Sequence, residues 1–176
     1  MYPIKIPTFD MTGKSVVVTG AGSGIGRAAA MIFAYYGAGV TVADISAQSA
    51  QETVDVIKEN GGKAISFVTD VSDEDQVESL VKAAEKEYGG VDVFVSNAGI
   101  GGASVPILEQ SRKDFEDVIG VNLKGAFFCG RQAAKQMIKQ DKGGRIIFTA
   151  SIAAIEGGGC HGPYGAAKGG LCTMVR

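Results

Sequence analysis

Short apolar runs rich in β-branched residues alternate along this chain with longer segments in which apolar residues recur at helical spacing. Continuous apolar runs of this length are typical of parallel strands that are buried on both faces of a sheet. Strands are therefore expected at 14–19, 39–44, 64–70, 91–96 and 145–151. Helices are expected at 25–36, from a cap at Ser46 to residue 60, from a cap at Ser72 to residue 89, at 111–139 and at 163–176.

The regular alternation of strands and helices, with short loops between them, predicts right-handed crossovers and a parallel sheet that helices cover on both faces. The expected fold is α/β: a Rossmann-type doubly wound parallel sheet in three layers, formed by a single domain over residues 1–176. Such sheets bind ligands at the carboxyl ends of their strands. The residues that fall at or just after these ends are Gly20, Asp44, Asp70, Asn97 and Ser151.

Composition and charge narrow the class of protein. The chain has 176 residues, of which 45% are hydrophobic and 20% charged, and its formal net charge is −2. Because there is no basic block, we expect no nucleic acid and no membrane surface as a partner. Three cysteines without metal-type spacing favour free thiols in the reduced cytoplasm and no metal site. Residues 1–7 lack the apolar core of a signal peptide, and no apolar run is long enough to span a bilayer.

Glycines crowd the segment that joins the first expected strand to the first helix. This segment, 19–26, reads TGAGSGIG, and the residues expected to contact a ligand are Gly20, Ser23, Gly24, Ile25 and Gly26. Glycines at a strand-to-helix turn let a pyrophosphate lie against the amides of the helix N-terminus. A purely structural turn is the alternative, because glycine-rich turns are common.

Asp44 ends the second expected strand, 18 residues after Gly26 (44 − 26). A carboxylate at this place can accept hydrogen bonds from the ribose hydroxyls of adenosine, and it would repel a 2′-phosphate. Ser23 is not basic, and no arginine or lysine closely follows Asp44. These features favour NAD over NADP as the cofactor. An aspartate that only caps the end of its strand is the alternative.

Tyr164 and Lys168 lie four residues apart in the last expected helix, so both side chains project from one face. An ammonium so close to a phenol stabilises the phenolate. A tyrosine stabilised in this way can exchange a proton with a carbinol oxygen. Ser151, at a strand end, can hydrogen-bond the same oxygen. Taken without other motifs, a tyrosine and a lysine at this spacing would be a solvated helix face.

Six motifs in order resemble the short-chain dehydrogenase/reductase family. They are Thr19–Gly26, Asp70-Val71, Asn97-Ala98-Gly99, Asn122, Ser151 and Tyr164-x-x-x-Lys168. The resemblance extends from about Gly13 to the end of the chain. The glycine spacing, Gly20-x-x-x-Gly24-x-Gly26, differs from the usual Gly-x-Gly-x-x-Gly fingerprint of dinucleotide-binding folds.

The resemblance implies a role for each matching residue. Tyr164 would be the acid/base, Ser151 the orienting hydroxyl and Lys168 the ribose-binding lysine that stabilises the phenolate. Asn122 would hold a water that links this lysine to solvent. The motif of Asn97, Ala98 and Gly99 would contact the ribose, and Asp70 and Val71 would contact the edge of the adenine. Structural roles are the alternatives: a turn for Asn97, a helix-approach cap for Asp70 and a polar group satisfied within its helix for Asn122.

The same resemblance implies a longer protein, with a sixth and a seventh strand and a substrate lid after Arg176. The chain would then be a C-terminally truncated member, and its helices at 122–139 and 163–176 would form a homo-oligomer. The expected activity is hydride transfer between NAD and the CH–OH or C=O group of a small alcohol, polyol or ketone. A dinucleotide-binding module with little or no turnover, and a fragment of a longer enzyme, are the alternatives.

Overall fold

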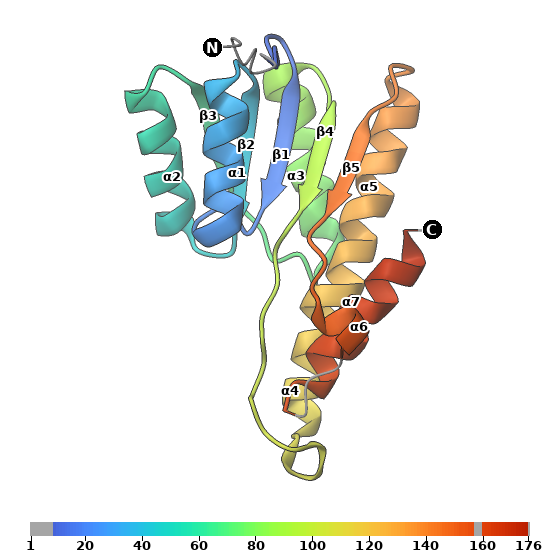
Figure 1. Ribbon diagram of the computed structural model, residues 1–176. Helices are drawn as coiled ribbons and strands as arrows, with labels where there is room; N and C mark the ends of the chain where they lie inside the picture. Colours follow the sequence, from blue (N-terminus) through green and yellow to red (C-terminus); the bar gives the residue numbers. More distant parts are fainter. Residues whose placement is uncertain (1–8, 157–159, 176) are drawn as a thin grey trace, which may run out of the picture.

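The computed structural model describes residues 9–156 and 160–175, so the segment examined for a signal peptide and the last residue of the expected 163–176 helix lie outside the described residues. Five parallel strands form one sheet in the order β3-β2-β1-β4-β5 (Figure 1). The strands are β1 (Ser15–Thr19), β2 (Gly39–Asp44), β3 (Lys63–Val68), β4 (Val93–Ser96) and β5 (Arg145–Phe148).

Helices cover both faces of the sheet. They are α1 (Gly24–Tyr35), α2 (Ala47–Glu59), α3 (Glu74–Tyr88), α4 (Arg112–Ile119), α5 (Ala126–Lys139), the short α6 (Ala153–Glu156) and α7 (Gly162–Met174). Alternate residues of β1 enter two separate cores, because successive side chains of a strand point to opposite faces. Val16 and Val18 pack with residues of α1 and α2, whereas Val17 packs with residues of α3 and α5. The three-layer Rossmann-type α/β fold is thereby confirmed.

The expected strands lie in the right places, but two of them end earlier than predicted. β3 ends at Val68 because its last partner, Asp44, is the last residue of β2. β5 ends at Phe148, which pairs with the last residue of β4, Ser96. Ser151 therefore does not extend the strand and lies in the segment between β5 and α6.

The helix predicted at 111–139 is divided into α4 and α5 by a π-helical segment, Gly120–Gly125. π-helical turns are found frequently at functional sites. The predicted cap at Ser72 is also wrong, because Asp73 caps α3 and accepts hydrogen bonds from the amides of Asp75 and Gln76. Ser72 instead donates from its amide and its hydroxyl to Asp70.

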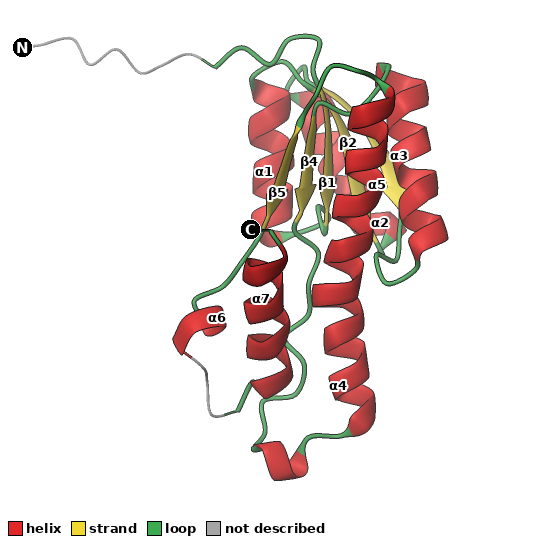
Figure 2. Ribbon diagram, turned by 90° about the vertical axis from the view of Figure 1, so that its right-hand side faces the viewer, coloured by secondary structure: helices red, strands yellow, loops and turns green. Residues whose placement is uncertain are grey.

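Two short elements were not predicted: α6 and a 3-10 turn at Ile107–Glu109. Figure 2 shows α6 and α7 beyond the carboxyl ends of the strands, beside the column formed by α4 and α5. The candidate site is thus bordered by the strand ends and by this helical extension. Across the described residues, every helix is too short or too polar to cross a membrane.

Candidate active site at the carboxyl ends of the strands

The glycine turn after β1 has a backbone that side chains would obstruct. Gly20 and Gly24 have φ angles of +62° and +52°, in the left-handed region that favours glycine. A Cβ on Gly26 would lie 2.2 Å from the backbone oxygen of Gly20, and one on Gly22 would lie 2.8 Å from the carboxylate of Asp44. The turn therefore brings the start of α1 directly against the end of β1. The outer side of the turn stays open.

The N-terminus of α1 is open to a ligand. Ser23 occupies the N-cap position, yet within the described residues its side chain makes no hydrogen bond to the helix. Ser23, Gly24 and Ile25 are exposed, so the first amides of the helix face a space that an anion can enter. This is the local geometry expected for a pyrophosphate-binding turn.

The Asp44 carboxylate is held in place by two backbone amides. Its Oδ2 accepts from the amide of Gly22 at 2.8 Å, and its Oδ1 accepts from the amide of Ser46 at 3.0 Å. Each carboxylate oxygen can accept a second hydrogen bond. Asp44 thus presents two oriented acceptors to a diol, which fits the predicted ribose-binding role.

One cavity of about 560 Å³ follows the carboxyl ends of β1, β2, β3 and β4. Residues predicted from the sequence to bind a cofactor make up most of its wall. They are Gly20, Ser23, Gly24, Ile25, Asp44, Asp70, Val71, Asn97, Ala98 and Gly99. The wall also contains Ile45, Thr69, Ile100 and Val121. The cavity has the size of a small-molecule site.

Asn97 lines this cavity, but its side chain is engaged by the protein. Its Nδ2 donates to the backbone oxygens of Thr19 and Gly20 at 3.1 and 3.3 Å. Its Oδ1 accepts from the hydroxyl of Thr149 at 3.1 Å. Asn97 therefore ties the end of β4 to the ends of β1 and β5, and the hydroxyl of Thr19 reinforces the tie by accepting from the amides of Asn97 and Ala98.

Asp70 and Val71 border the other end of the cavity. The Asp70 carboxylate accepts from Ser72, while the Asp70 amide donates to the side chain of Gln76 at 2.9 Å. Asp70 therefore caps the approach to α3 through its bonds with Ser72, and it also lies on the cavity wall. The Val71 side chain is buried, and a Cβ on Gly125 would lie 2.9 Å from it, so the π-helical segment packs closely there.

Asn122 and Lys168 are buried next to each other beneath Gly99. A Cβ on Gly99 would lie 2.5 Å from Asn122 Oδ1 and 3.8 Å from Lys168 Nζ. Asn122 exchanges two hydrogen bonds with the backbone of Ile100, at 2.8 and 3.1 Å, and also donates to the oxygen of Val118 at 3.0 Å. It is satisfied partly within its helix and partly by the loop after β4, which it holds in place.

Lys168 reaches the segment after β5. Its Nζ donates to the backbone oxygen of Thr149 at 2.7 Å, and burial lowers the pKa of the ammonium below its ordinary value of 10.5. The same Nζ lies 5.7 Å from the centre of the Tyr164 ring, on the same face of α7. Tyr164 and Lys168 therefore lie beside each other on α7, as the spacing predicted.

Ser151 lies at the entrance to α6, where its hydroxyl accepts from the amide of Ala153 at 3.2 Å. No hydrogen bond joins Ser151 to Tyr164 among the described residues. Their elements do pack together, since a Cβ on Gly165 would lie 3.1 Å from the oxygen of Ala153. Asn122, Tyr164 and Lys168 therefore form one group, and Ser151 lies in the segment before α6, the helix that packs against α7.

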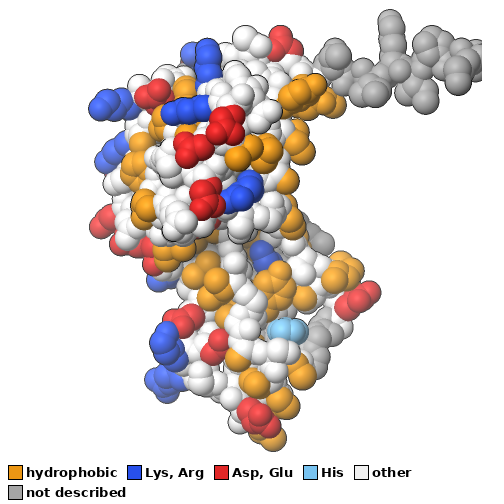
Figure 3. Space-filling model, turned by 90° about the vertical axis from the view of Figure 1, so that its left-hand side faces the viewer, with side chains coloured by type: hydrophobic (Ala, Val, Ile, Leu, Met, Phe, Trp, Pro, Cys, Tyr) orange, Lys and Arg blue, Asp and Glu red, His pale blue; other side chains and the backbone are white. Residues whose placement is uncertain are grey.

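Figure 3 shows a hollow between the sheet-bearing part of the molecule and the helical extension, with hydrophobic side chains gathered on the extension. Exposed apolar residues of the extension include Ile107, Leu108, Ile152 and Ile155. Exposed apolar patches mark interaction surfaces or ligand-binding grooves. These residues lie in the 3-10 turn at Ile107–Glu109, in α6 and directly before α6, and the sequence pattern predicted neither element.

A family model described as short chain dehydrogenase matches residues 14–176. The chain belongs to the short-chain dehydrogenase/reductase family. An uncharacterised oxidoreductase from Thermotoga maritima is 40% identical over 165 residues, which are 94% of this chain and 64% of that protein. The 2,5-dichloro-2,5-cyclohexadiene-1,4-diol dehydrogenase of Sphingobium indicum is 36% identical over 95% of this chain and 66% of its own length.

Solved structures of short-chain dehydrogenases superpose closely on this chain. A member from Burkholderia phymatum in complex with NAD has a TM-score of 0.90 and 36% identity, over 94% of this chain and 59% of that one. An NAD⁺-bound xylitol dehydrogenase has a TM-score of 0.90 and 33% identity, over 94% of this chain and 64% of that one. The chain therefore spans between 59% and 66% of the length of these relatives.

Proposed function

We propose that this chain binds NAD and carries the proton-transfer groups of an oxidoreductase. Hydride would move between the nicotinamide and the CH–OH or C=O group of a small alcohol, polyol or ketone. The observation that carries the proposal is a single cavity bordered by the open N-terminus of α1 and by the oriented carboxylate of Asp44. The names of the relatives support the substrate class, since they include a diol dehydrogenase and a xylitol dehydrogenase.

The residues present fit a dinucleotide. The amides at Ser23–Ile25 would hold the pyrophosphate, Asp44 the adenosine ribose, and Asp70 with Val71 the adenine. Asp44 also supports NAD over NADP, because its charge repels a 2′-phosphate. When bound, the nicotinamide accepts or supplies the hydride.

The side chains of this chain would manage the proton. Tyr164 exchanges a proton with the carbinol oxygen, and Ser151 hydrogen-bonds the same oxygen. Lys168 stabilises the phenolate from one helical turn away and would bind the nicotinamide ribose. Asn122 fixes the loop after β4 beside Lys168 and would hold the water that links this lysine to solvent.

A binding module with little turnover is the second candidate. One observation favours it: the residues that line the cavity lie between Gly20 and Val121, and Ser151, Tyr164 and Lys168 are not among them. Titration with NADH and NADPH, followed by nicotinamide fluorescence, tests the binding that both candidates share. Tight and preferential NADH binding supports it, and binding of neither nucleotide contradicts both. A turnover assay with alcohols, polyols and ketones then separates the two.

A further inference from the structure

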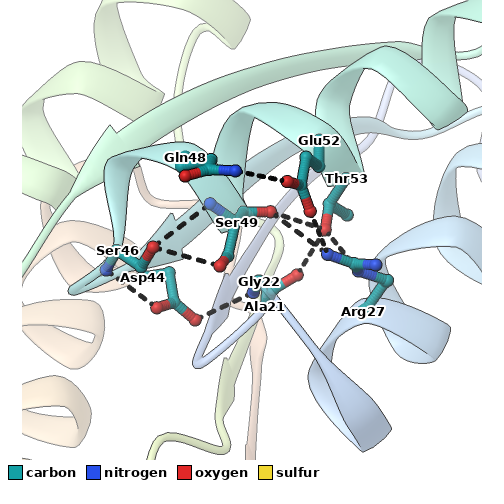
Figure 4. Close-up of polar contacts among 9 residues, drawn as sticks. All are labelled: Ala21, Gly22, Arg27, Asp44, Ser46, Gln48, Ser49, Glu52 and Thr53. Carbon is teal, nitrogen blue, oxygen red and sulfur yellow. Dashed lines mark hydrogen bonds and ion pairs between the residues drawn. The ribbon is translucent and has the colours of Figure 1, made fainter.

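A group of polar side chains lies behind the glycine turn, between α1 and α2 (Figure 4). At its centre is Thr53 of α2, which is completely buried. Its hydroxyl lies 2.9 Å from the backbone oxygen of Ala21 and 3.1 Å from that of Ser49. Thr53 is not part of the cavity wall, so it would affect a ligand only through the turn.

The peptide unit between Ala21 and Gly22 is held at both of its polar atoms. Its oxygen accepts from the Thr53 hydroxyl at 2.9 Å, and its N–H donates to the Asp44 carboxylate at 2.8 Å. The preceding amide, that of Ala21, donates to the backbone oxygen of Ala43 at 3.0 Å. Rotation of this peptide would break both of its bonds at once, and the buried hydroxyl would lose a partner.

Arg27 orients the Thr53 hydroxyl. Its Nε donates to Thr53 Oγ1 at 2.9 Å, so the hydroxyl accepts from the guanidinium and its only hydrogen is left for a carbonyl. The guanidinium is itself held by Glu52, at 3.3 Å, and by the oxygen of Ser49, at 3.5 Å. Figure 4 shows this series of contacts from Arg27 through Thr53 to Ala21, with Asp44 on the other side of Gly22.

We propose that Thr53 is a positioning residue for dinucleotide binding, with Arg27 acting through it. This inference rests on the proposed function. The clamped peptide immediately precedes the amides at Ser23–Ile25, and the same clamp fixes the carboxylate of Asp44. Loss of the Thr53 hydroxyl lets the peptide rotate, which moves the pyrophosphate-binding amides and releases Asp44 from Gly22. Both effects weaken binding of the adenosine diphosphate half of NAD.

The test is Thr53→Val, which removes the hydroxyl and keeps the shape of the side chain. The dissociation constant for NADH should rise about tenfold, the effect of losing one buried hydrogen bond. Thr53→Ser, which restores a hydroxyl, should return the constant to within about twofold of the wild type. Thr41→Val is the matched control, because Thr41 is completely buried and its hydroxyl has no hydrogen-bond partner among the described residues. It should leave the constant unchanged.

Thermal unfolding separates positioning from a merely structural role. A folded Thr53→Val protein with a lower Tm but wild-type NADH affinity would overturn the proposal. If Thr53→Val does not fold, Arg27→Met provides the same test, since it leaves Thr53 in place and should weaken NADH binding. Lys82→Met is its control and should bind as the wild type does, because Lys82 pairs with Glu78 on α3, which covers the other face of the sheet. If Arg27→Met binds NADH normally, the proposal fails.

The proposed function and this inference fail in different ways. Failure of the wild-type chain to bind NADH contradicts the proposed function itself. Normal NADH binding by the wild type and equally tight binding by Thr53→Val contradict the positioning role alone. A double variant of Thr53 and Arg27 adds a further check, because residues that act through one contact show non-additive effects. Its NADH affinity should match that of Thr53→Val.

Discussion

Lys168 Nζ donates a hydrogen bond of 2.7 Å to the backbone oxygen of Thr149, which joins the middle of α7 to the segment after β5. The hydroxyl of the same threonine donates to Asn97, and Asn97 donates to Thr19 at the end of β1. The helix that carries the proposed proton-transfer groups is thus connected to the base of the glycine turn. The two halves of the candidate site are parts of one hydrogen-bonded structure.

Tyr164→Phe should abolish turnover with little loss of NADH affinity. The substitution removes only the hydroxyl, and general acid–base catalysis contributes on the order of 10²- to 10⁴-fold to a rate. Steady-state kcat and an NADH titration measure the two effects separately. Tyr35→Phe, at an exposed residue of α1, is the control. Wild-type kcat in Tyr164→Phe would remove Tyr164 from the acid/base role.

Asp44→Ala should relax the preference for NAD toward NADP. The variant loses a charged acceptor for the ribose hydroxyls, worth about 1.5–3 kcal/mol, and no longer repels a 2′-phosphate. Dissociation constants for NADH and NADPH, measured side by side, give the change in selectivity. Asp55→Ala, on α2, is the control, since the only side-chain hydrogen bond of Asp55 among the described residues is to the exposed Gln51. Unchanged selectivity would exclude Asp44 from the ribose site.

Gly26→Ala should destabilise the fold by at least about 2 kcal/mol and abolish NADH binding. The added Cβ would lie 2.2 Å from the backbone oxygen of Gly20 and 2.6 Å from Asn97 Nδ2, so the turn would have to move. Gly120→Ala is the matched control, because a Cβ there meets open space and the backbone is helical. Urea denaturation of both variants measures the difference. Equal stability would contradict the close packing of the turn.

Lys168 should give the stability of the protein a particular pH dependence. Burial lowers the pKa of its ammonium below 10.5 in the folded state, so the unfolded chain binds more protons between the lowered pKa and 10.5. Below the pKa of the folded state, burial of the charged ammonium lowers the free energy of unfolding by its full amount. This destabilisation disappears as the pH rises through the window and the ammonium loses its proton. The Tm of the wild type, relative to that of Lys168→Met, should therefore rise with pH toward 10.5. A difference that is constant with pH would show that the ammonium is not desolvated.

We expect self-association through α5 and α7. Phe127 and Ile138 of α5 are 46% and 79% exposed and lie eleven residues apart, which places them on one face of the helix. Phe127→Asp should shift the sedimentation coefficient toward that of a monomer, since a charge in an apolar interface is strongly unfavourable. Tyr35→Asp, at an exposed residue of α1, should not. A monomeric wild type would rule out the interface.

The sequence located the strands and most of the cavity wall, because apolar runs and glycine turns are local signals. Gly20 and Asn97 follow strands, and Asp44 ends one, and the pattern placed all three of these strands correctly. The pattern did not predict the π-helical segment. Asn122, which lies in this segment, forms hydrogen bonds with Ile100, a residue 22 positions away. A local pattern contains no information about a partner at that distance.

The sequence by itself determined the alternation of strands and helices, the family and the residues that stand at the strand ends. Periodicity and turn chemistry act over a few residues, so they can be read along the chain. Only the tertiary structure decided the strand order and the contacts that cross it, such as Thr53 with Ala21 and Lys168 with Thr149. Those contacts arise when the sheet and its helices pack, and packing joins residues that no local pattern relates.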